Sequence, residues 1–172
     1  MLRTVTHMPS GILSAAVPLL ALGLLAGCAG PGPRDPATQA NASLAAGRLD
    51  DAVRQIDLAV SQRPRNPALR LQAARIHARA DDVEGAIVQL EEALQLTPAN
   101  PEISVQLGLL EQRRGNLPDA YVAFRRAAEL APDDLRAVSG LALSAEALGF
   151  EEEAAASYAR WAELEREQGR GN

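Results

Sequence analysis

The feature that most constrains this chain of 172 residues is a period of 34 residues that runs through most of its length. Three sets of positions carry the period: the alanines Ala52, Ala86, Ala120 and Ala154, the alanines Ala59, Ala93 and Ala127, and the prolines Pro64, Pro98 and Pro132. A fixed period of this length predicts one helix–turn–helix unit copied along the chain, each copy packing on its neighbours. We therefore expect an all-α solenoid of about four repeats, and a function in binding rather than in chemistry.

Composition supports this expectation. Alanine, the best helix former, makes up roughly a fifth of the chain, and the β-branched residues form no alternating run that would indicate a strand. The net charge is -5 and only 3% of residues are aromatic. Nucleic-acid binding favours a basic surface and stacking aromatic rings, so the sequence predicts no nucleic-acid partner.

The repeat domain is expected over residues 33–168, followed by a tail at 169–172. The predicted units are 33–66, 67–100, 101–134 and 135–168. Helix-start signals open them: Asp35-Pro36, Asn66-Pro67, Asn100-Pro101 and Asp134. The turn inside each unit should adopt the left-handed conformation at Gly47, Asp81, Gly115 and Gly149. The first helix, with Thr38, Gln39, Asn41 and Ser43, is weak, so its start should fray.

Residues 1–27 are expected to be a signal peptide. Arg3 and His7 begin it, and an uncharged segment follows at 11–27. Its apolar part has the length of a secretory signal and is short for a membrane span of about 20 residues.

The sequence Leu25-Ala26-Gly27-Cys28 resembles the lipobox of bacterial lipoproteins. The resemblance implies lipid transfer to the Cys28 thiol, cleavage before it and acylation of the new amino group. Residues 28–35 would then form a short lipid tether. Because Ala29 follows the cysteine, the resemblance places the protein at the periplasmic face of the outer membrane. The outer face of the inner (cytoplasmic) membrane is the alternative, and an uncleaved amino-terminal anchor on a protein facing the cytoplasm is another.

The repeats resemble the tetratricopeptide repeat (TPR), whose fold is a right-handed solenoid. The third unit matches the family best, at Leu107, Gly108, Gly115, Ala120, Phe124, Ala127 and Pro132. Across the units, the large position of the second helix reads Ile56, Leu90, Phe124 and Tyr158, and the small position of the first helix reads Ala40, Ala74, Gly108 and Ala142. The family's aromatic residue on the first helix is missing.

The resemblance implies that the first helix of each unit lines a concave, partner-binding groove. The corresponding residues are Leu71, Arg75, Arg79, Val105, Leu109, Gln112, Arg113, Arg136, Leu143 and Glu146. An apolar floor edged by four arginines would suit a peptide or helix with apolar anchors and acidic neighbours. The alternative is that the leucines are core and the arginines ordinary solvated charges. The asparagine and lysine clamp with which some relatives hold a carboxyl terminus is not reproduced.

No catalytic or metal-binding constellation emerges from the sequence. The predicted mature chain keeps one histidine, His77, at a packing position between helices, and no free thiol. Asp81-Asp82 and Asp133-Asp134 fall at helix boundaries, where aspartate caps amides, and lack the spacing of a calcium loop. We expect no enzyme activity, no metal and no cofactor.

The final helix offers a second candidate surface at Tyr158, Trp161, Ala162 and Leu164. In one interpretation the helix caps itself, with Trp161 filling the last gap, and the protein is a monomer. In the other, these residues form an apolar patch for a partner or for a dimer.

The function expected from these features is that of a membrane-anchored scaffold or adaptor that binds protein partners during assembly of envelope complexes. The chain is similar to small TPR lipoproteins that assist pilus or secretion-system biogenesis. An adaptor or regulator of periplasmic peptidoglycan hydrolases or proteases is the alternative. An enzyme is the alternative of another class, and the missing histidines and thiols argue against it.

Overall fold

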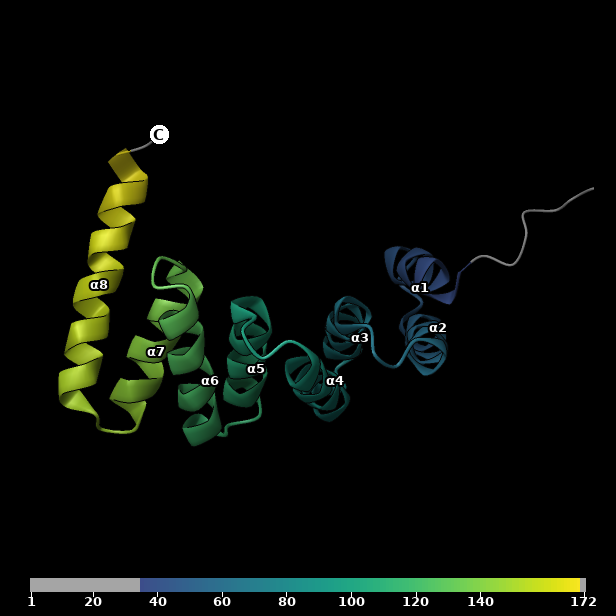
Figure 1. Ribbon diagram of the computed structural model, residues 1–172, viewed down its shortest axis with the longest axis horizontal. Helices are drawn as coiled ribbons and strands as arrows, with labels where there is room; N and C mark the ends of the chain where they lie inside the picture. The colour runs from purple at the N-terminus through teal and green to yellow at the C-terminus, as the bar shows by residue number, and fades with distance from the viewer. Residues whose placement is uncertain (1–34, 171–172) are drawn as a thin grey trace, which may run out of the picture. The chain divides into compact units, whose positions relative to one another are not determined.

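The structure is a computed structural model that describes residues 35–170 of the chain. The expected signal peptide, Cys28 and nearly all of the tether lie outside the described residues. Within 35–170 the chain forms eight helices and no strand, and the predicted all-α array of helix–turn–helix units is confirmed (Figure 1). The helices are α1 (Pro36–Ala45), α2 (Leu49–Gln62), α3 (Pro67–Arg79), α4 (Val83–Leu96), α5 (Pro101–Arg113), α6 (Leu117–Leu130), α7 (Leu135–Ala147) and α8 (Glu151–Arg170).

The helices are arranged in antiparallel pairs that follow one another along the chain. Each odd-numbered helix, here called an A helix, packs on the even-numbered B helix that follows it, and each B helix packs on the next A helix. The helices α2, α4 and α6 have 14 residues, whereas α8 has 20 and runs past residue 168 into the segment expected to be a tail. Figure 1 shows α8 at the end of the array, beside α7.

All four A helices begin directly after their predicted cap residues, and three of those residues make a capping hydrogen bond. Asn66, Asn100 and Asp134 each accept a hydrogen bond from a backbone N–H in the first turn of the following helix. Asp35 makes no such bond, and its carboxylate instead pairs with Arg63 at 2.6 Å. The helix α1 has 10 residues against 13 for α3, α5 and α7, as its weak sequence suggests.

The four turns inside the units all adopt the predicted left-handed conformation. The φ angles are 72° at Gly47, 66° at Asp81, 83° at Gly115 and 77° at Gly149. Glycine reaches this region without a steric penalty, and aspartate is among the side chains that tolerate it. The same turn geometry therefore recurs in all four units, with glycine at the left-handed position in three of them and aspartate in one.

The core holds large buried residues from both kinds of helix, including Ile76 and Ile103 on A helices, together with many buried alanines. Ile56 and Leu90 are fully buried, and Phe124 is 1% exposed. A Cβ atom added to Gly108 would lie 2.9 Å from the Phe124 ring, and one added to Gly140 would overlap the ring. The Phe124 ring thus occupies space that two glycines leave open on α5 and α7.

An arginine side chain donates a hydrogen bond to each of the three turns between units. The carbonyl oxygens of Pro64, Pro98 and Pro132 accept hydrogen bonds from Arg70, Arg126 and Arg160, at donor–acceptor distances of 2.7, 2.8 and 3.4 Å. These carbonyls follow the ends of B helices, where backbone acceptors have no partner within the helix. The guanidinium groups supply the missing donors.

Candidate partner-binding face

The exposed side of the A helices carries a groove of about 700 Å³. It is lined by Asn41, Leu44, Ala68, Gln72, Arg75, Ile76, Ala78, Arg79 and Gln106. These residues come from α1, α3 and α5 alone, so the A helices of three successive units share the groove. We call it the A-helix groove. The Gln72 side chain donates to the Asn41 amide oxygen at 2.9 Å and so joins α3 to α1 across it.

Several of the residues predicted for a binding groove lie on this face. Arg75 and Arg79 line the A-helix groove. Leu109 on α5 and Leu143 on α7 are 47% and 44% exposed, which is high for large apolar side chains. The two leucines occupy the same position in successive units and extend the face beyond the groove. Four further predicted residues are exposed: Gln112, Arg113, Arg136 and Glu146.

Two predicted groove residues belong to the core instead. Val105 is fully buried and packs in a cluster with Ala127 of α6 and Ala137 of α7, so its prediction as a groove residue is wrong. Leu71 is half-buried and packs against the core cluster of the second and third units. Their common position in the unit faces the neighbouring helices rather than the open side.

A series of ion pairs connects α3, α5 and α7 across this face. Arg75 of α3 and Arg136 of α7 both donate to the Glu102 carboxylate of α5, at 3.0 and 2.7 Å, and Arg136 also pairs with Asp134 at 2.8 Å. Partial burial raises the pKa of Glu102, but hydrogen bonds from Arg136, Gln106 and Arg75 outweigh burial, so the pKa lies below its ordinary value. Hydrogen bonding to Arg136 likewise lowers the pKa of Asp134.

Most of the predicted groove arginines are therefore already paired within the protein and are less available to a partner than the sequence suggests. Arg113 pairs with Asp81 and donates to the Ala78 carbonyl at 3.0 Å. Among the four predicted arginines, Arg79 is the one that forms no ion pair within residues 35–170. Glu146 is also occupied, because it accepts a hydrogen bond from the Tyr158 hydroxyl at 2.5 Å. The face is close to electrically balanced and retains one unpaired cation beside the A-helix groove.

Sequence reasoning missed Glu102, Asn41 and Gln72. A signal for Glu102 was present, since Glu102 and Arg136 are 34 residues apart and hold the same position in successive units with opposite charge. Opposite charges at equivalent positions of neighbouring units indicate an ion pair between their A helices.

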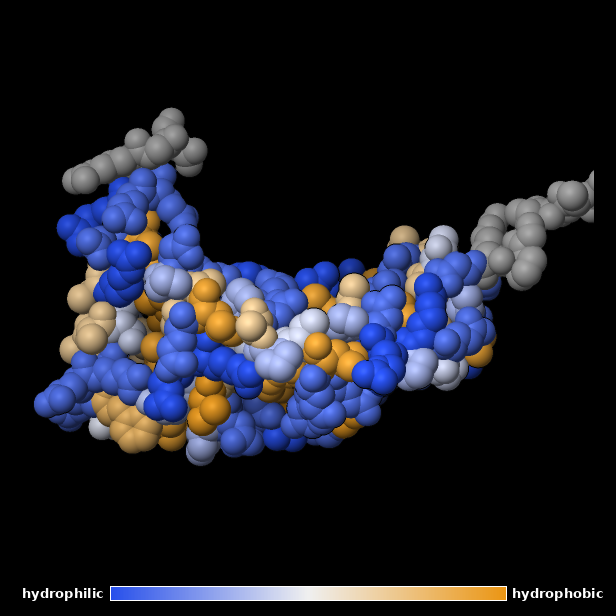
Figure 2. All heavy atoms as spheres, viewed as in Figure 1, coloured by the Kyte–Doolittle hydropathy of each residue, from blue (hydrophilic) through white to orange (hydrophobic). Residues whose placement is uncertain are grey.

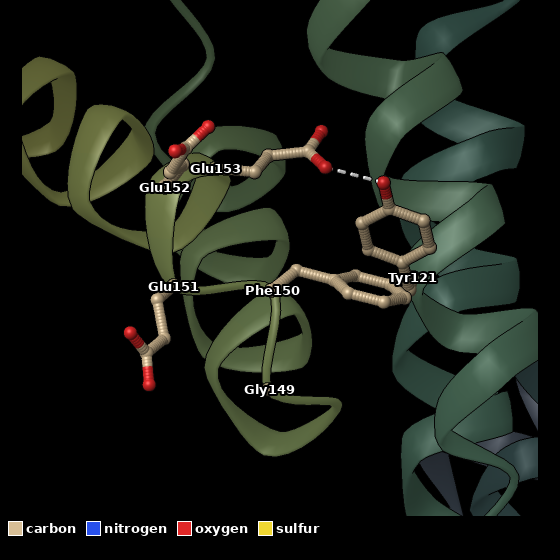
Figure 3. Close-up of a pocket in the computed structure, with 6 residues that line it drawn as sticks. All are labelled: Tyr121, Gly149, Phe150, Glu151, Glu152 and Glu153. Atoms are coloured by element: carbon tan, nitrogen blue, oxygen red, sulfur yellow. Dashed lines mark hydrogen bonds between the residues drawn. The ribbon is translucent and has the colours of Figure 1, made fainter.

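A second hollow, of about 460 Å³, lies at the start of α8 (Figure 3). It is lined by Tyr121, Gly149, Phe150, Glu151, Glu152 and Glu153. The Phe150 ring meets the Tyr121 ring edge-on at 5.1 Å, and the Tyr121 hydroxyl donates to Glu153. Phe150 remains 45% exposed. None of the predicted groove residues lines this hollow.

Around Trp161, the end of the array is partly covered by its own side chains. The Trp161 and Tyr158 rings stack at 6.1 Å, both are half-buried, and Leu164 is 3% exposed.

Three broader features complete the description of residues 35–170. No group of three or more His, Cys, Asp or Glu side chains among them is placed to hold a metal ion. None of the eight helices is both long enough and apolar enough to span a membrane. In Figure 2, apolar residues are scattered among polar ones over the visible face.

The repeats identify the family. A family model described as tetratricopeptide repeat matches residues 43–106 and 78–142, which together span more than half of the chain. The chain belongs to the tetratricopeptide repeat family. TPR domains are protein-interaction folds, and the match is to no catalytic family. No curated protein matches the sequence of this TPR chain.

Solved structures share the fold of this TPR protein. A crystal structure of MamA superposes with a TM-score of 0.72 at 19% identity, covering 78% of this chain and 79% of MamA. MamA residues 41 to the end from Desulfovibrio magneticus give a TM-score of 0.69 at 21% identity, covering 77% and 75%. The first TPR domain of Spaghetti (RPAP3), bound to the HSP90 peptide SRMEEVD, gives 0.61 at 21% identity, covering 66% and 90%. At these identities the likeness establishes the fold.

Proposed function

We propose that this TPR protein is a lipid-anchored scaffold that binds a segment of a protein partner on the A-helix face. The observation that carries the proposal is the combination of the A-helix groove with Leu109 and Leu143, two large apolar side chains nearly half exposed on the same face. Apolar side chains held open on a rigid array, beside a polar hollow, are the features that peptide recognition uses.

The chemistry of the face describes the partner segment. The part built by α1 and α3 offers amides from Asn41 and Gln72 and the unpaired cation Arg79. The part built by α5 and α7 offers Leu109 and Leu143. We expect a segment with two apolar anchors at one end and polar or acidic residues at the other. The RPAP3 structure shows a TPR domain holding a peptide, which supports a peptide as the class of ligand here.

For the scaffold role, the matched variants are Leu109→Asp with Leu143→Asp on the A-helix face and Val88→Asp with Val122→Asp on B helices. The valines are 48% and 55% exposed, so the same change places the same charge on equally open sites. We expect the leucine pair to lose the crosslinked partners recovered from cells and the valine pair to keep them. Equal recovery from both variants would contradict the proposal.

The cellular setting is the second part of the proposal. We infer that Cys28 carries the lipid, that the domain faces the periplasm from the outer membrane, and that its partners belong to an envelope complex such as a pilus or secretion system. What supports this inference is the likeness of Leu25-Ala26-Gly27-Cys28 to a lipobox, with Ala29 after it.

Replacing Cys28 with serine should abolish attachment of the lipid and so remove the lipid anchor of the domain. Each buried CH₂ of an acyl chain contributes about 0.8 kcal/mol to membrane binding, so loss of several chains removes the anchor. Membrane fractionation with mass spectrometry of the amino terminus measures this. The wild-type chain should begin at an acylated Cys28, and a wild-type chain retaining an unmodified Met1 would contradict the proposed anchor and location. The serine variant should lose the lipid, with Ser43→Ala as the matched control that stays bound.

A further inference from the structure

His77 is buried between two carboxylates from different helices. Its side chain is 8% exposed, its Nδ1 lies 2.7 Å from Asp82 Oδ2, and its Nε2 lies 2.9 Å from Asp57 Oδ1. Asp57 belongs to α2 in the first unit, whereas His77 lies in the last turn of α3 and Asp82 caps α4 in the second. The imidazole ring therefore bridges the first and second units.

This arrangement is built from residues that break the repeat pattern. The positions equivalent to His77 hold Ser43, Glu111 and Ala145, and those equivalent to Asp82 hold Arg48, Asn116 and Phe150. The positions equivalent to Gly85 hold Asp51, Asp119 and Glu153. A Cβ atom at Gly85 would overlap Asp82 Oδ2 and lie 2.8 Å from His77 Nδ1. Three departures specific to the second unit thus meet at one place, and the glycine makes room for the other two.

Both contacts can be hydrogen bonds at the same time only if the ring is protonated. A carboxylate can only accept hydrogen bonds, so both ring nitrogens must donate, and only the imidazolium form has two N–H groups. Asp82 is held ionised, because the Gly85 N–H and His77 lower its pKa. Within residues 35–170 neither Asp57 nor Asp82 forms an ion pair with an arginine. Loss of one ring proton would therefore turn a lone pair toward a carboxylate and leave two negative charges without a cation between them.

We propose that the His77 bridge is a proton-dependent joint, which holds the first unit against the second while the ring carries two protons and loosens when one is lost. Histidine is the side chain that ordinarily exchanges this proton between about pH 5 and pH 8. The joint is tightest at the acidic end of that range. The charged groups in contact with the ring are Asp57 of α2 and Asp82, which caps α4. The proposal does not depend on the binding function of the A-helix face.

Loosening at this joint would act on the A-helix groove. Asn41 and Leu44 of α1 belong to the first unit, and the α3 residues of the groove belong to the second. A change in how the two units pack changes the width of the groove between them. The third and fourth units have no histidine and should not respond.

Hydrogen exchange of the full-length chain, corrected for the intrinsic pH dependence of exchange, tests the joint. Between about pH 5.5 and pH 8, the opening constants of amides in α2 and α3 should rise about tenfold, the scale of one charge-assisted hydrogen bond. Amides in α7 should stay unchanged.

The decisive variant is Asp57→Asn. An asparagine amide can donate to the neutral ring at Nε2 while Nδ1–H still donates to Asp82, so every contact is satisfied in both protonation states. We expect the tenfold rise to shrink below about twofold in this variant, and to disappear in His77→Gln. If the opening constants in Asp57→Asn still rose about tenfold between about pH 5.5 and pH 8, the proposal would be overturned, because the pH response would not come from the ring between two carboxylates. This outcome can be read even if His77→Gln fails to fold.

Discussion

Replacing Phe124 with alanine is expected to lower the free energy of unfolding by about 3–5 kcal/mol. The Phe124 ring is 1% exposed and lies against Gly108 of α5 and Gly140 of α7, so its removal leaves a cavity at the centre of the third and fourth units. Glycines cannot fill that cavity, since they have no side chain to rearrange. Stabilities of single domains are about 5–15 kcal/mol, so this one change removes a large share of the total.

Urea unfolding followed by circular dichroism measures the effect. The matched control is Val122→Ala on the same helix, where the side chain is 55% exposed, and its effect should stay within about 0.5 kcal/mol. A loss below about 1 kcal/mol for Phe124→Ala would show that the ring is not the packing centre of these units.

Gly140→Ala should destabilise the protein although alanine is the better helix former. Inside a helix this change ordinarily stabilises by about 1 kcal/mol. At Gly140 the new methyl group would overlap the Phe124 ring, and overpacking of a core costs about 1–3 kcal/mol. We expect a net loss of up to about 2 kcal/mol in the free energy of unfolding.

A double-mutant cycle separates this effect from a simple loss of helix stability. In the Phe124→Ala background the overlap is gone, so Gly140→Ala should become neutral or stabilising. Gly169→Ala in α8, where a Cβ would meet no atom within 4 Å, is the control that should not destabilise. If Gly140→Ala lowered stability equally in both backgrounds, contact with Phe124 would not be the cause.

Most of the fold could be predicted because it rests on local and periodic signals. The cap residues Asn66, Asn100 and Asp134 act through the next few residues, and the turn at Asp81 is set by its own backbone. The period of 34 residues then fixes which units are neighbours. No long-range information is needed for these features, so one sequence is sufficient to predict them.

The binding face was harder to predict because it depends on long side chains that reach other units. Arg75 and Arg136 extend to Glu102 across separations of 27 and 34 residues, and the pairing removes charges that appear free in the sequence. Val105 illustrates the second difficulty. Buried and exposed residues alternate within one or two turns of α5. The 34-residue period alone did not show that this valine lies on the buried side.

His77 shows how a departure from the repeat can carry information. Its position predicts packing between helices, and the structure adds two carboxylate partners that the sequence pattern does not connect. Asp57 lies 20 residues away, in the preceding unit. The shared signal was that His77, Asp82 and Gly85 all differ from their equivalents in the other units.

Site-specific photocrosslinking in cells tests the central claim, that partners bind on the A-helix face. A photoreactive residue is placed at Leu109 or Leu143, and for comparison at Val88 or Val122 on B helices, which are equally exposed. The account predicts that the two leucine positions capture the same protein and that the two valine positions capture none. Capture at the valine positions alone would contradict it, because the binding surface would then lie on the B helices.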